Sequence, residues 1–488
     1  MDNNLRNKTI TGSFWTIIER FGYLTLQFVS NIVLARLLLP EDFGTIGILL
    51  VFVTISEVLV DGGFSTALIQ RKQIGSTDIS TVFYTNLAIS VIIYLVIFIF
   101  SPGIALYFKN ESLSFLLRVI EIKIIIDAFG AVQLALLRRE MDFKSITVIR
   151  IISIFFAVLI AIVLALFDFG VWALVVQNIS FSLLSVFFAW LYSSWRPQFV
   201  FSKNSLSNLF GYGSKLMVQQ LLSEIYENFQ SVLIGRYFLT KDLGFFTQAK
   251  QLQQVPVKSL SSIVTSVSFP AFSKLQDDKQ SLKRVVRKNL NVLLFVNTPL
   301  MFYLSVLAKP IIIFLYSEKW LPSVPYFQLL CMGFGVFLVI HQCNLSVLKA
   351  VGRSDYVLYL EIIKKILGFC LLISGMKLWG IWGILYGLLI NSFLEMFLNG
   401  FFVNREIKYS ITEQFQDLFQ TVLYSSPPAI MVLLILKMNL ICGNFFVLCV
   451  CSLIYWGVYY LFTRALKSQS LHEIEIIIKE YLIKKVNI

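Results

Sequence analysis

Long uncharged runs of apolar residues recur from one end of this chain to the other. Residues 92–100 and 151–166 are two examples in which no charged side chain interrupts the run. A helix needs about 20 largely apolar residues to cross a bilayer. Each crossing must be helical, because lipid offers backbone N–H and C=O groups no partner. The runs are continuous rather than alternating, which argues against a membrane β-barrel. The sequence therefore predicts an all-α, polytopic membrane protein.

The composition agrees with this fold class. Of the 488 residues only 14% are charged and 57% are hydrophobic, whereas soluble domains carry roughly 25% charged residues. The net charge of +13 would suggest nucleic acid as a partner of a soluble protein. Here it is explained by loop cations on one side of a membrane, so no nucleic acid is expected. The six cysteines lie in apolar segments without a C-x-x-C pair, so neither a disulfide framework nor a zinc site is predicted.

Apolar runs between charged or Pro/Gly breaks predict about fourteen membrane spans. They lie near residues 12–38, 43–69, 79–101, 114–137, 145–166, 170–193, 208–235, 244–271, 288–316, 323–349, 355–376, 380–403, 416–437 and 441–463. The first twelve form two pseudo-symmetric six-helix lobes, and the last two follow them. We expect these parts: an N-lobe at 1–193, a cytoplasmic linker at 194–207, a C-lobe at 208–403, helices 13 and 14 at 404–463, and a cytoplasmic amphipathic tail at 464–488. The tail is predicted to lie at the membrane interface or to dock a partner.

The two lobes are predicted from an internal repeat. The segment NIVLARLLLPEDFGTIG at 31–47 is written again as SVLIGRYFLTKDLGFFTQ from residue 231. Arg36 matches Arg236 and Gly44 matches Gly244, at one offset of 200 residues without a gap. The segments FGVWAL and WGIWGI likewise open the sixth and the twelfth span. Because each copy has an even number of spans, the halves are predicted to be parallel, related by an axis along the membrane normal.

Loop cations predict the orientation. The densest cationic connection holds Lys274, Lys279, Lys283, Arg284, Arg287 and Lys288. This connection lies on the same side as both termini, so the positive-inside bias places both termini in the cytoplasm. The polar N-terminus carries no signal-peptide pattern and agrees with a cytoplasmic start. The repeated turns after Arg36 and Arg236 are then predicted on the outer face, with these arginines holding the rims or pairing with Asp42 and Asp242.

Ionisable residues inside the spans are the functional candidates. Such a residue at the centre of a span costs about 2.5–3.5 kcal/mol, so it usually faces a bundle interior or a water-filled cavity. Glu57 and Asp61 lie four residues apart on one face of the second span. The fourth span holds Glu121, Lys123 and Asp127. Of these, Lys123 and Asp127 can pair at i, i+4. The predicted substrate-binding cations are Arg20, Lys123, Arg150 and Lys258. The predicted ion-coupling acids are Glu57, Asp61, Asp127, Glu224 and Glu395.

Transport is predicted rather than catalysis. No connection is long enough for a catalytic domain, and no Walker A sequence occurs, so no catalytic residue, metal site or cofactor is expected. His341 is predicted to be a hydrogen-bonded packing residue. Arg150 and Lys258 have an alternative reading, because a cation near a span end can snorkel to the headgroups. As a set, the buried cations and acids fit a cavity for a polar, anionic substrate, with H⁺ or Na⁺ as the coupling ion.

Four segments carry a resemblance to a known family. They are FWTIIERFG from Phe14, VLARLLLPEDFGTIGIL from Val33, DGGFSTALIQRK from Asp61 and LLRREMDF from Leu136. With them the chain resembles the polysaccharide transporter family, which exports O-antigen, colanic-acid and teichuronic-acid repeat units. That family lies within the multidrug/oligosaccharidyl-lipid/polysaccharide flippase superfamily.

The resemblance implies a flippase of the bacterial cytoplasmic (inner) membrane. Its substrate would be a polyprenyl-diphosphate-linked oligosaccharide, moved to the outer face by alternating access for surface polysaccharide synthesis such as lipopolysaccharide or capsule. A polysaccharide polymerase and chain-length proteins are the implied partners. Two alternatives remain open: a cation-coupled multidrug or metabolite extruder of the same fold, and a membrane polysaccharide polymerase or ligase.

Overall fold

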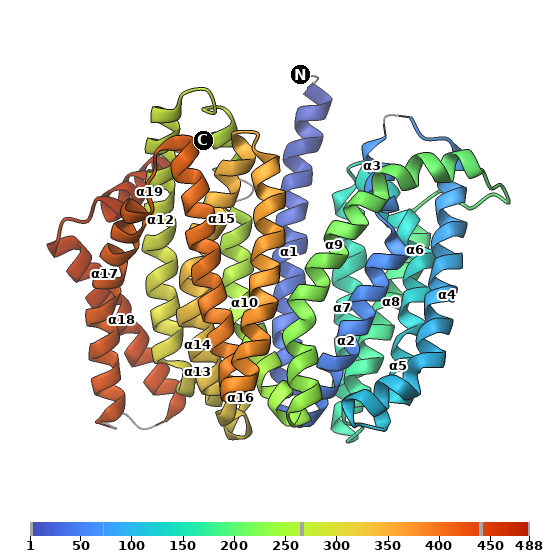
Figure 1. Cartoon of the computed structure of the whole chain (residues 1–488), viewed down its shortest axis with the longest axis horizontal. Helices are drawn as coiled ribbons and strands as arrows, with labels where there is room; N and C mark the ends of the chain where they lie inside the picture. The colour runs from blue at the N-terminus through green and yellow to red at the C-terminus, as the bar shows by residue number, and fades with distance from the viewer. Residues whose placement is uncertain (1–2, 72, 264–267, 439–442, 487–488) are drawn as a thin grey trace. The chain divides into compact units, whose positions relative to one another are not determined.

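Helices joined by short connections make up the described part of the chain, residues 3–71, 73–263, 268–438 and 443–486 of a computed structural model (Figure 1). The contacts divide the chain into two compact units, Met1–Thr247 and Gln248–Ile488. The predicted all-α class is confirmed.

Unit 1 contains the first nine helices and the start of the tenth. They are α1 (Asn3–Leu37), α2 (Pro40–Asp61), α3 (Phe64–Gln70), α4 (Ser76–Phe108), α5 (Ser112–Ile120), α6 (Ile122–Arg139), α7 (Phe143–Leu166), α8 (Val171–Tyr192), α9 (Lys203–Tyr237) and α10 (Thr240–Ile263). Helix α7 packs between α1 and α8, and α9 packs along α2.

Unit 2 contains the remainder of α10 and the helices that follow it. They are α11 (Phe269–Ser273), α12 (Lys279–Val306), α13 (Ala308–Tyr316), the 3-10 turn η2 (Glu318–Ser323), α14 (Val324–Leu330), the π-helical turn η3 (Cys331–Gly335), α15 (Val336–Ala350), α16 (Ser354–Ile407), α17 (Ile411–Lys437), α18 (Asn444–Ala465) and α19 (Gln469–Val486). Helix α12 packs against both α15 and α17.

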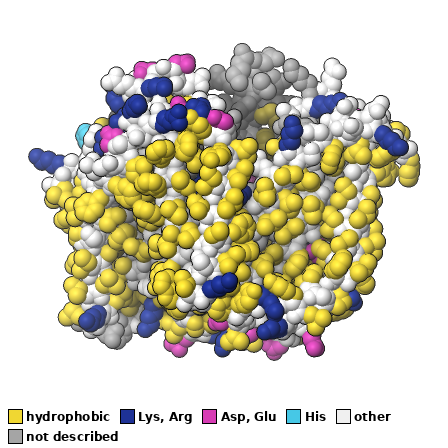
Figure 2. Space-filling view, in the orientation of Figure 1, with side chains coloured by type: hydrophobic (Ala, Val, Ile, Leu, Met, Phe, Trp, Pro, Cys, Tyr) yellow, Lys and Arg dark blue, Asp and Glu magenta, His cyan; other side chains and the backbone are white. Residues whose placement is uncertain are grey.

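Eight helical stretches of the described chain are long and apolar enough to cross a membrane. They are α2, α4, α7, α8, α12, the run Glu318–Ala350, α17 and α18. The other predicted spans also coincide with helices, on α1, α5 with α6, α9, α10 and the two halves of α16. On the face of each unit seen in Figure 2, hydrophobic side chains cover the middle of the helices, and charged ones gather toward their ends. This is the distribution of a multi-pass membrane protein.

The repeated segments form the same helix–turn–helix. Helices α1 and α9 end at Leu37 and Tyr237, and α2 and α10 begin at Pro40 and Thr240, so each boundary keeps the offset of 200 residues. In the first copy the Asp42 carboxylate accepts a hydrogen bond from the Leu39 N–H at 2.9 Å. In the second copy the Asp242 carboxylate accepts one from the Leu239 N–H at 3.3 Å. These carboxylates stabilise the positive ends of the two helix dipoles.

The two turns also pack reciprocally within unit 1. A Cβ atom on Gly44 would overlap the carbonyl of Thr240, and one on Gly244 would overlap the carbonyl of Pro40. Only glycine permits so close a backbone approach at these positions. Nearby, the Arg236 guanidinium lies 4.8 Å from the centre of the Tyr107 ring, a cation–π contact.

A second repeat signature is confirmed by backbone conformation. Gly170, just before α8, has φ 56° and ψ −131°. Gly380, inside α16, has φ 59° and ψ −134°. Both values lie outside the range that L side chains adopt without strain. At Gly380 this conformation breaks α16 into the two halves that the sequence predicted as separate spans.

The contact-based units and the repeat-based lobes divide the chain at different places. Helix α9 opens the second repeat, but it packs on α2, α3 and α4 and so belongs to unit 1. The division into lobes at 1–193 and 208–403 therefore stays a prediction about duplicated sequence.

Candidate functional site

Lys123 is the centre of a charged group inside unit 1. Its ammonium donates to the carboxylate of Asp127, one turn further along α6, with an N–O distance of 2.6 Å. It also donates to the carboxylate of Glu57 on α2. The Lys123 side chain is only 11% exposed, while Glu57 and Asp127 are 40% and 36% exposed. A largely buried cation is thus held by two acids that remain accessible.

A second ion pair joins α7 to α1 in the same unit. The Arg150 guanidinium donates to the Glu19 carboxylate at 2.6 Å. Tyr23, one turn after Glu19 on α1, has Arg150, Lys123 and Glu57 as its electrostatic neighbours. Tyr23 therefore lies between the two groups, and the charges on α1, α2, α6 and α7 form one polar region. We call Glu19, Tyr23, Glu57, Lys123, Asp127 and Arg150 the unit 1 charge cluster.

Asp61 lies at the end of α2, at the edge of this cluster. The Ser65 hydroxyl donates to its carboxylate across the turn that follows α2. In that turn Gly62 and Gly63 have φ values of 54° and 74°. Asp61 is also an electrostatic neighbour of Arg138, as Glu19 and Arg150 are. Asp61 thus supports the local turn and faces the arginine end of the cluster.

Three other predicted site residues are not part of the unit 1 charge cluster. Arg20 is exposed on α1. Glu224 lies on α9, where the Asn228 amide approaches its carboxylate at 3.4 Å and the Thr54 hydroxyl on α2 at 3.3 Å. The side chain of Lys258 lies outside the described residues.

Glu395 belongs to a separate polar group in unit 2. Its carboxylate accepts a hydrogen bond from Asn391 at 2.9 Å and lies 3.8 Å from the His341 ring. The ring in turn shares a hydrogen bond of 2.9 Å with Asn399. Lys364, which is 2% exposed, is an electrostatic neighbour of both Glu395 and His341. His341 is therefore hydrogen-bonded, as predicted, but it contacts a candidate coupling acid.

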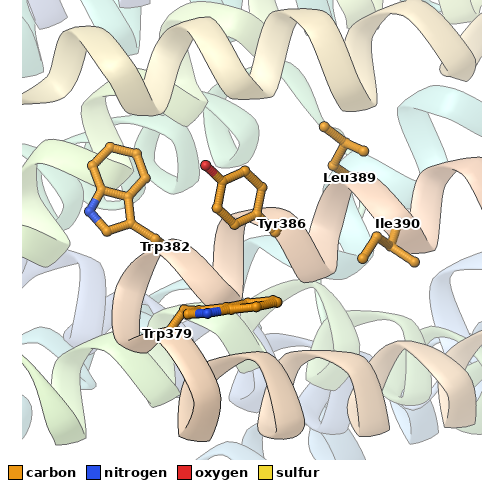
Figure 3. A pocket seen from close by; sticks show the side chains of 5 residues that line it. All are labelled: Trp379, Trp382, Tyr386, Leu389 and Ile390. Carbon is orange, nitrogen blue, oxygen red and sulfur yellow. The ribbon is translucent and has the colours of Figure 1, made fainter.

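An apolar pocket of about 470 Å³ also lies in unit 2, beside the bend of α16. Figure 3 shows its lining residues, Trp379, Trp382, Tyr386, Leu389 and Ile390. The Trp379 and Tyr386 rings meet edge to face, with their centres 6.5 Å apart. The lining carries no charged side chain, so this pocket is not where the predicted cations and acids meet.

Two members of the cluster were not predicted from the sequence. These are Glu19 and Tyr23. Their spacing of four residues places them on one face of a helix, and this was the available signal. Glu121 was noted in the fourth span but not chosen. Among the described residues, no group of three or more His, Cys, Asp or Glu side chains is placed to hold a metal ion.

Residues 33–325 match a sequence family described as polysaccharide biosynthesis protein. The chain is 27% identical over 369 residues to the succinoglycan biosynthesis transport protein ExoT of Rhizobium meliloti, covering 75% of this chain and 74% of ExoT. It is 25% identical over 431 residues to the lipopolysaccharide biosynthesis protein WzxC of Escherichia coli, covering 88% of this chain and 87% of WzxC.

Solved structures share the fold. The lipid II flippase MurJ in an inward closed conformation superposes with a TM-score of 0.74 at 17% identity, covering 94% of this chain and 98% of MurJ. An inward-facing multidrug resistance MATE transporter superposes with a TM-score of 0.60 at 18% identity, covering 80% of this chain and 98% of that one. At such identities these likenesses establish the helical architecture alone.

Proposed function

Since the chain belongs to the polysaccharide biosynthesis protein family, we propose that it is a flippase for a polyprenyl-diphosphate-linked oligosaccharide. It would move the repeat unit from the inner to the outer face of the bacterial cytoplasmic membrane by alternating access. Its relatives of known name are transport and biosynthesis proteins for surface polysaccharides. On this proposal the protein carries out transport and not a chemical reaction.

The observation that carries the proposal is the pairing of Lys123 with two accessible acids. A diphosphate must lose much of its hydration to cross the membrane, and fixed cations can replace that hydration with charge-assisted hydrogen bonds. Lys123 is already neutralised by Glu57 and Asp127, so an anionic substrate has to compete with them. The cluster therefore acts as an exchange site, where the substrate and the two carboxylates alternate as partners of one ammonium.

Exchange at Lys123 supplies a route to ion coupling. When the substrate takes Lys123, Glu57 and Asp127 lose their cation, and a proton or a sodium ion would replace it. Asp61 and Glu224 in unit 1 and Glu395 in unit 2 are the further coupling candidates. The further substrate-binding candidates are Arg20, Arg150 and Lys258. Substrate binding would release Arg150 from Glu19, in the same way that it releases Lys123 from Glu57 and Asp127.

The membrane potential supplies a driving force for the return of the empty carrier. When protons or sodium ions neutralise Glu57 and Asp127, the empty group that these acids form with Lys123 carries one net positive charge. It is then drawn inward by an inside-negative potential, worth about 2.3 kcal/mol per charge per 100 mV. Both termini would be cytoplasmic, as the cationic loops require. A polymerase and chain-length proteins would receive the exported unit on the outer face.

Deleting the gene tests the function. The flippase proposal expects lipid-linked oligosaccharide to accumulate on the cytoplasmic face and surface glycan to fall, with both restored by the wild-type gene. A Lys123→Met gene should fail to restore export, whereas a Lys203→Met gene, altered at an exposed lysine at the start of α9, should succeed. Normal surface glycan combined with sensitivity to cationic drugs would instead support the extruder.

A further inference from the structure

Glu121 is an ionisable residue that the proposed exchange does not use. It lies at the junction of α5 and α6, and its backbone N–H still donates to the carbonyl of Leu117. Its side chain is completely buried. Among the described residues, neither carboxyl oxygen has a well-formed hydrogen bond, and the Ser56 hydroxyl on α2 is the donor that approaches the group. A charged carboxylate in such a place would be strongly destabilising.

The surroundings of Glu121 offer it no cation of its own. From α2 it faces the buried Ser56 hydroxyl and the Glu57 carboxylate, and from α6 it faces Lys123. The Lys123 ammonium is directed to Glu57 and Asp127. Arg118, on α5 itself, is directed instead to α4, where it donates to the Ser101 hydroxyl at 2.8 Å.

The other helices packed around this junction add no counter-charge. Helix α8 has no charged residue. The one charged residue within α4 is Asp78, in its first turn, which lies near the opposite end of that helix from the α4–α5 connection. An ionised Glu121 would therefore add a second uncompensated negative charge to a group that already holds two acids and one cation.

We propose that Glu121 is a proton-binding residue that controls whether Lys123 can accept an anion. With a proton on Glu121, the group of Glu57, Lys123 and Asp127 carries one net negative charge. Without that proton the same region carries two, and its repulsion of a diphosphate increases. This proposal rests on the proposed function, because it assigns the proton as the coupled ion at the same site. Protonation of Glu121 and anion binding at Lys123 then favour each other, as thermodynamic linkage requires.

Infrared difference spectroscopy tests the proton directly. Wild-type protein in lipid nanodiscs at neutral pH should show a C=O stretching band of a protonated carboxyl that is absent in Glu121→Gln. The control is Glu111→Gln, at an exposed glutamate just before α5, which should lose only bands of ionised carboxylate. Loss of ionised bands alone in Glu121→Gln would overturn the proposal, whatever the protein transports.

Binding of farnesyl diphosphate tests the linkage. Wild-type affinity should fall by about tenfold between about pH 6 and about pH 9, the effect of one added like charge at an effective protein dielectric. Glu121→Gln keeps this position neutral, so its affinity should fall less, while Glu111→Gln should follow the wild type. Parallel pH curves for wild type and Glu121→Gln would contradict the linkage. If the wild type binds no farnesyl diphosphate at any pH, the diphosphate function fails, and the infrared result still decides the protonation of Glu121.

Discussion

Lys123 and Glu57 are joined by a hydrogen-bonded ion pair although 66 residues separate them in sequence. The pair ties α6 to α2, and Asp127 holds the same ammonium from the other side. The shared cation joins the two helices, and this structural role can be separated by experiment from the transport role that we propose for it.

Lys123→Met should stop export and destabilise unit 1. Two carboxylates lose their cation, which we expect to cost about 1–2 kcal/mol after allowance for their partial exposure. The triple variant with Glu57→Gln and Asp127→Asn removes the orphaned charges, so it should regain stability but not export. Thermal unfolding in detergent and an assay of surface glycan measure the two effects. Export restored to wild-type levels in the triple variant would show that Lys123 does not bind the substrate.

Exchanging the charges of Glu19 and Arg150 should separate packing from binding. Either reversal alone places like charges in contact between α1 and α7, so we expect less folded protein. The swap Glu19→Arg with Arg150→Glu re-forms the pair, with a coupling free energy of about 0.5–3 kcal/mol. Export should stay low in the swap, because the cation now lies on α1. Full export would show that Arg150 only joins the two helices.

Gly44→Ala and Gly244→Ala should each destabilise the crossing of the repeated turns. The new methyl group would overlap a backbone carbonyl of the facing turn, so the backbone has to shift and we expect a loss of about 1–3 kcal/mol or more. Gly103→Ala and Gly457→Ala are matched controls in helices α4 and α18, since nothing lies within 4 Å of an added Cβ there. These controls should be neutral or slightly stabilising, because alanine favours helix over glycine. Equal melting temperatures for all four variants would contradict the close packing.

Asp278 should give the start of α12 a pH-dependent stability. Hydrogen bonds from the Ser281 side chain and from the N–H groups of Ser281 and Gln280 hold the pKa of its carboxyl below the ordinary value. Since the folded-state pKa is the lower one, the contribution is complete above the unfolded pKa of about 3.9. It is lost as the pH falls through the folded value.

Asp278→Ala should therefore lower the melting temperature at pH 7, and the difference from wild type should shrink below about pH 4. Asp277→Ala, at the exposed neighbouring position, serves as the control and should change little. A difference that remains constant through the acid range would mean that ionisation of Asp278 does not stabilise the start of α12.

Features carried by local sequence were predictable. The offset between Arg36 and Arg236 placed both helix–turn–helix units, because a repeated turn sequence imposes the same backbone. The spacing of Lys123 and Asp127 predicted their contact, since residues four apart lie on one face of a helix. The tail was predicted to be helical, and its Glu473 reaches Lys288 on α12 at 3.4 Å.

Features that depend on packing between helices were not predictable. Arg150 meets Glu19 across 131 residues, and no spacing rule within one helix reports which faces of two helices meet. Glu121 was visible as a charge in a span, but its isolation depends on the directions taken by Lys123 and Arg118. The spacing of charged residues in the sequence shows which face of a helix they share. The rotation and packing of the helices determine which residues of other helices they contact.

The mutual contact of Gly44 and Gly244 is the contact that two identical chains would make about a two-fold axis. In such a homodimer the same surface serves both partners, so every substitution acts twice. Once both copies belong to a single chain, each side of the contact is free to diverge. The two copies differ accordingly. Pro40 and Glu41 of the first copy correspond to Thr240 and Lys241 of the second, whereas the glycine is the same in both. The turn thus keeps a two-fold-related contact in a protein whose two faces need not be equivalent.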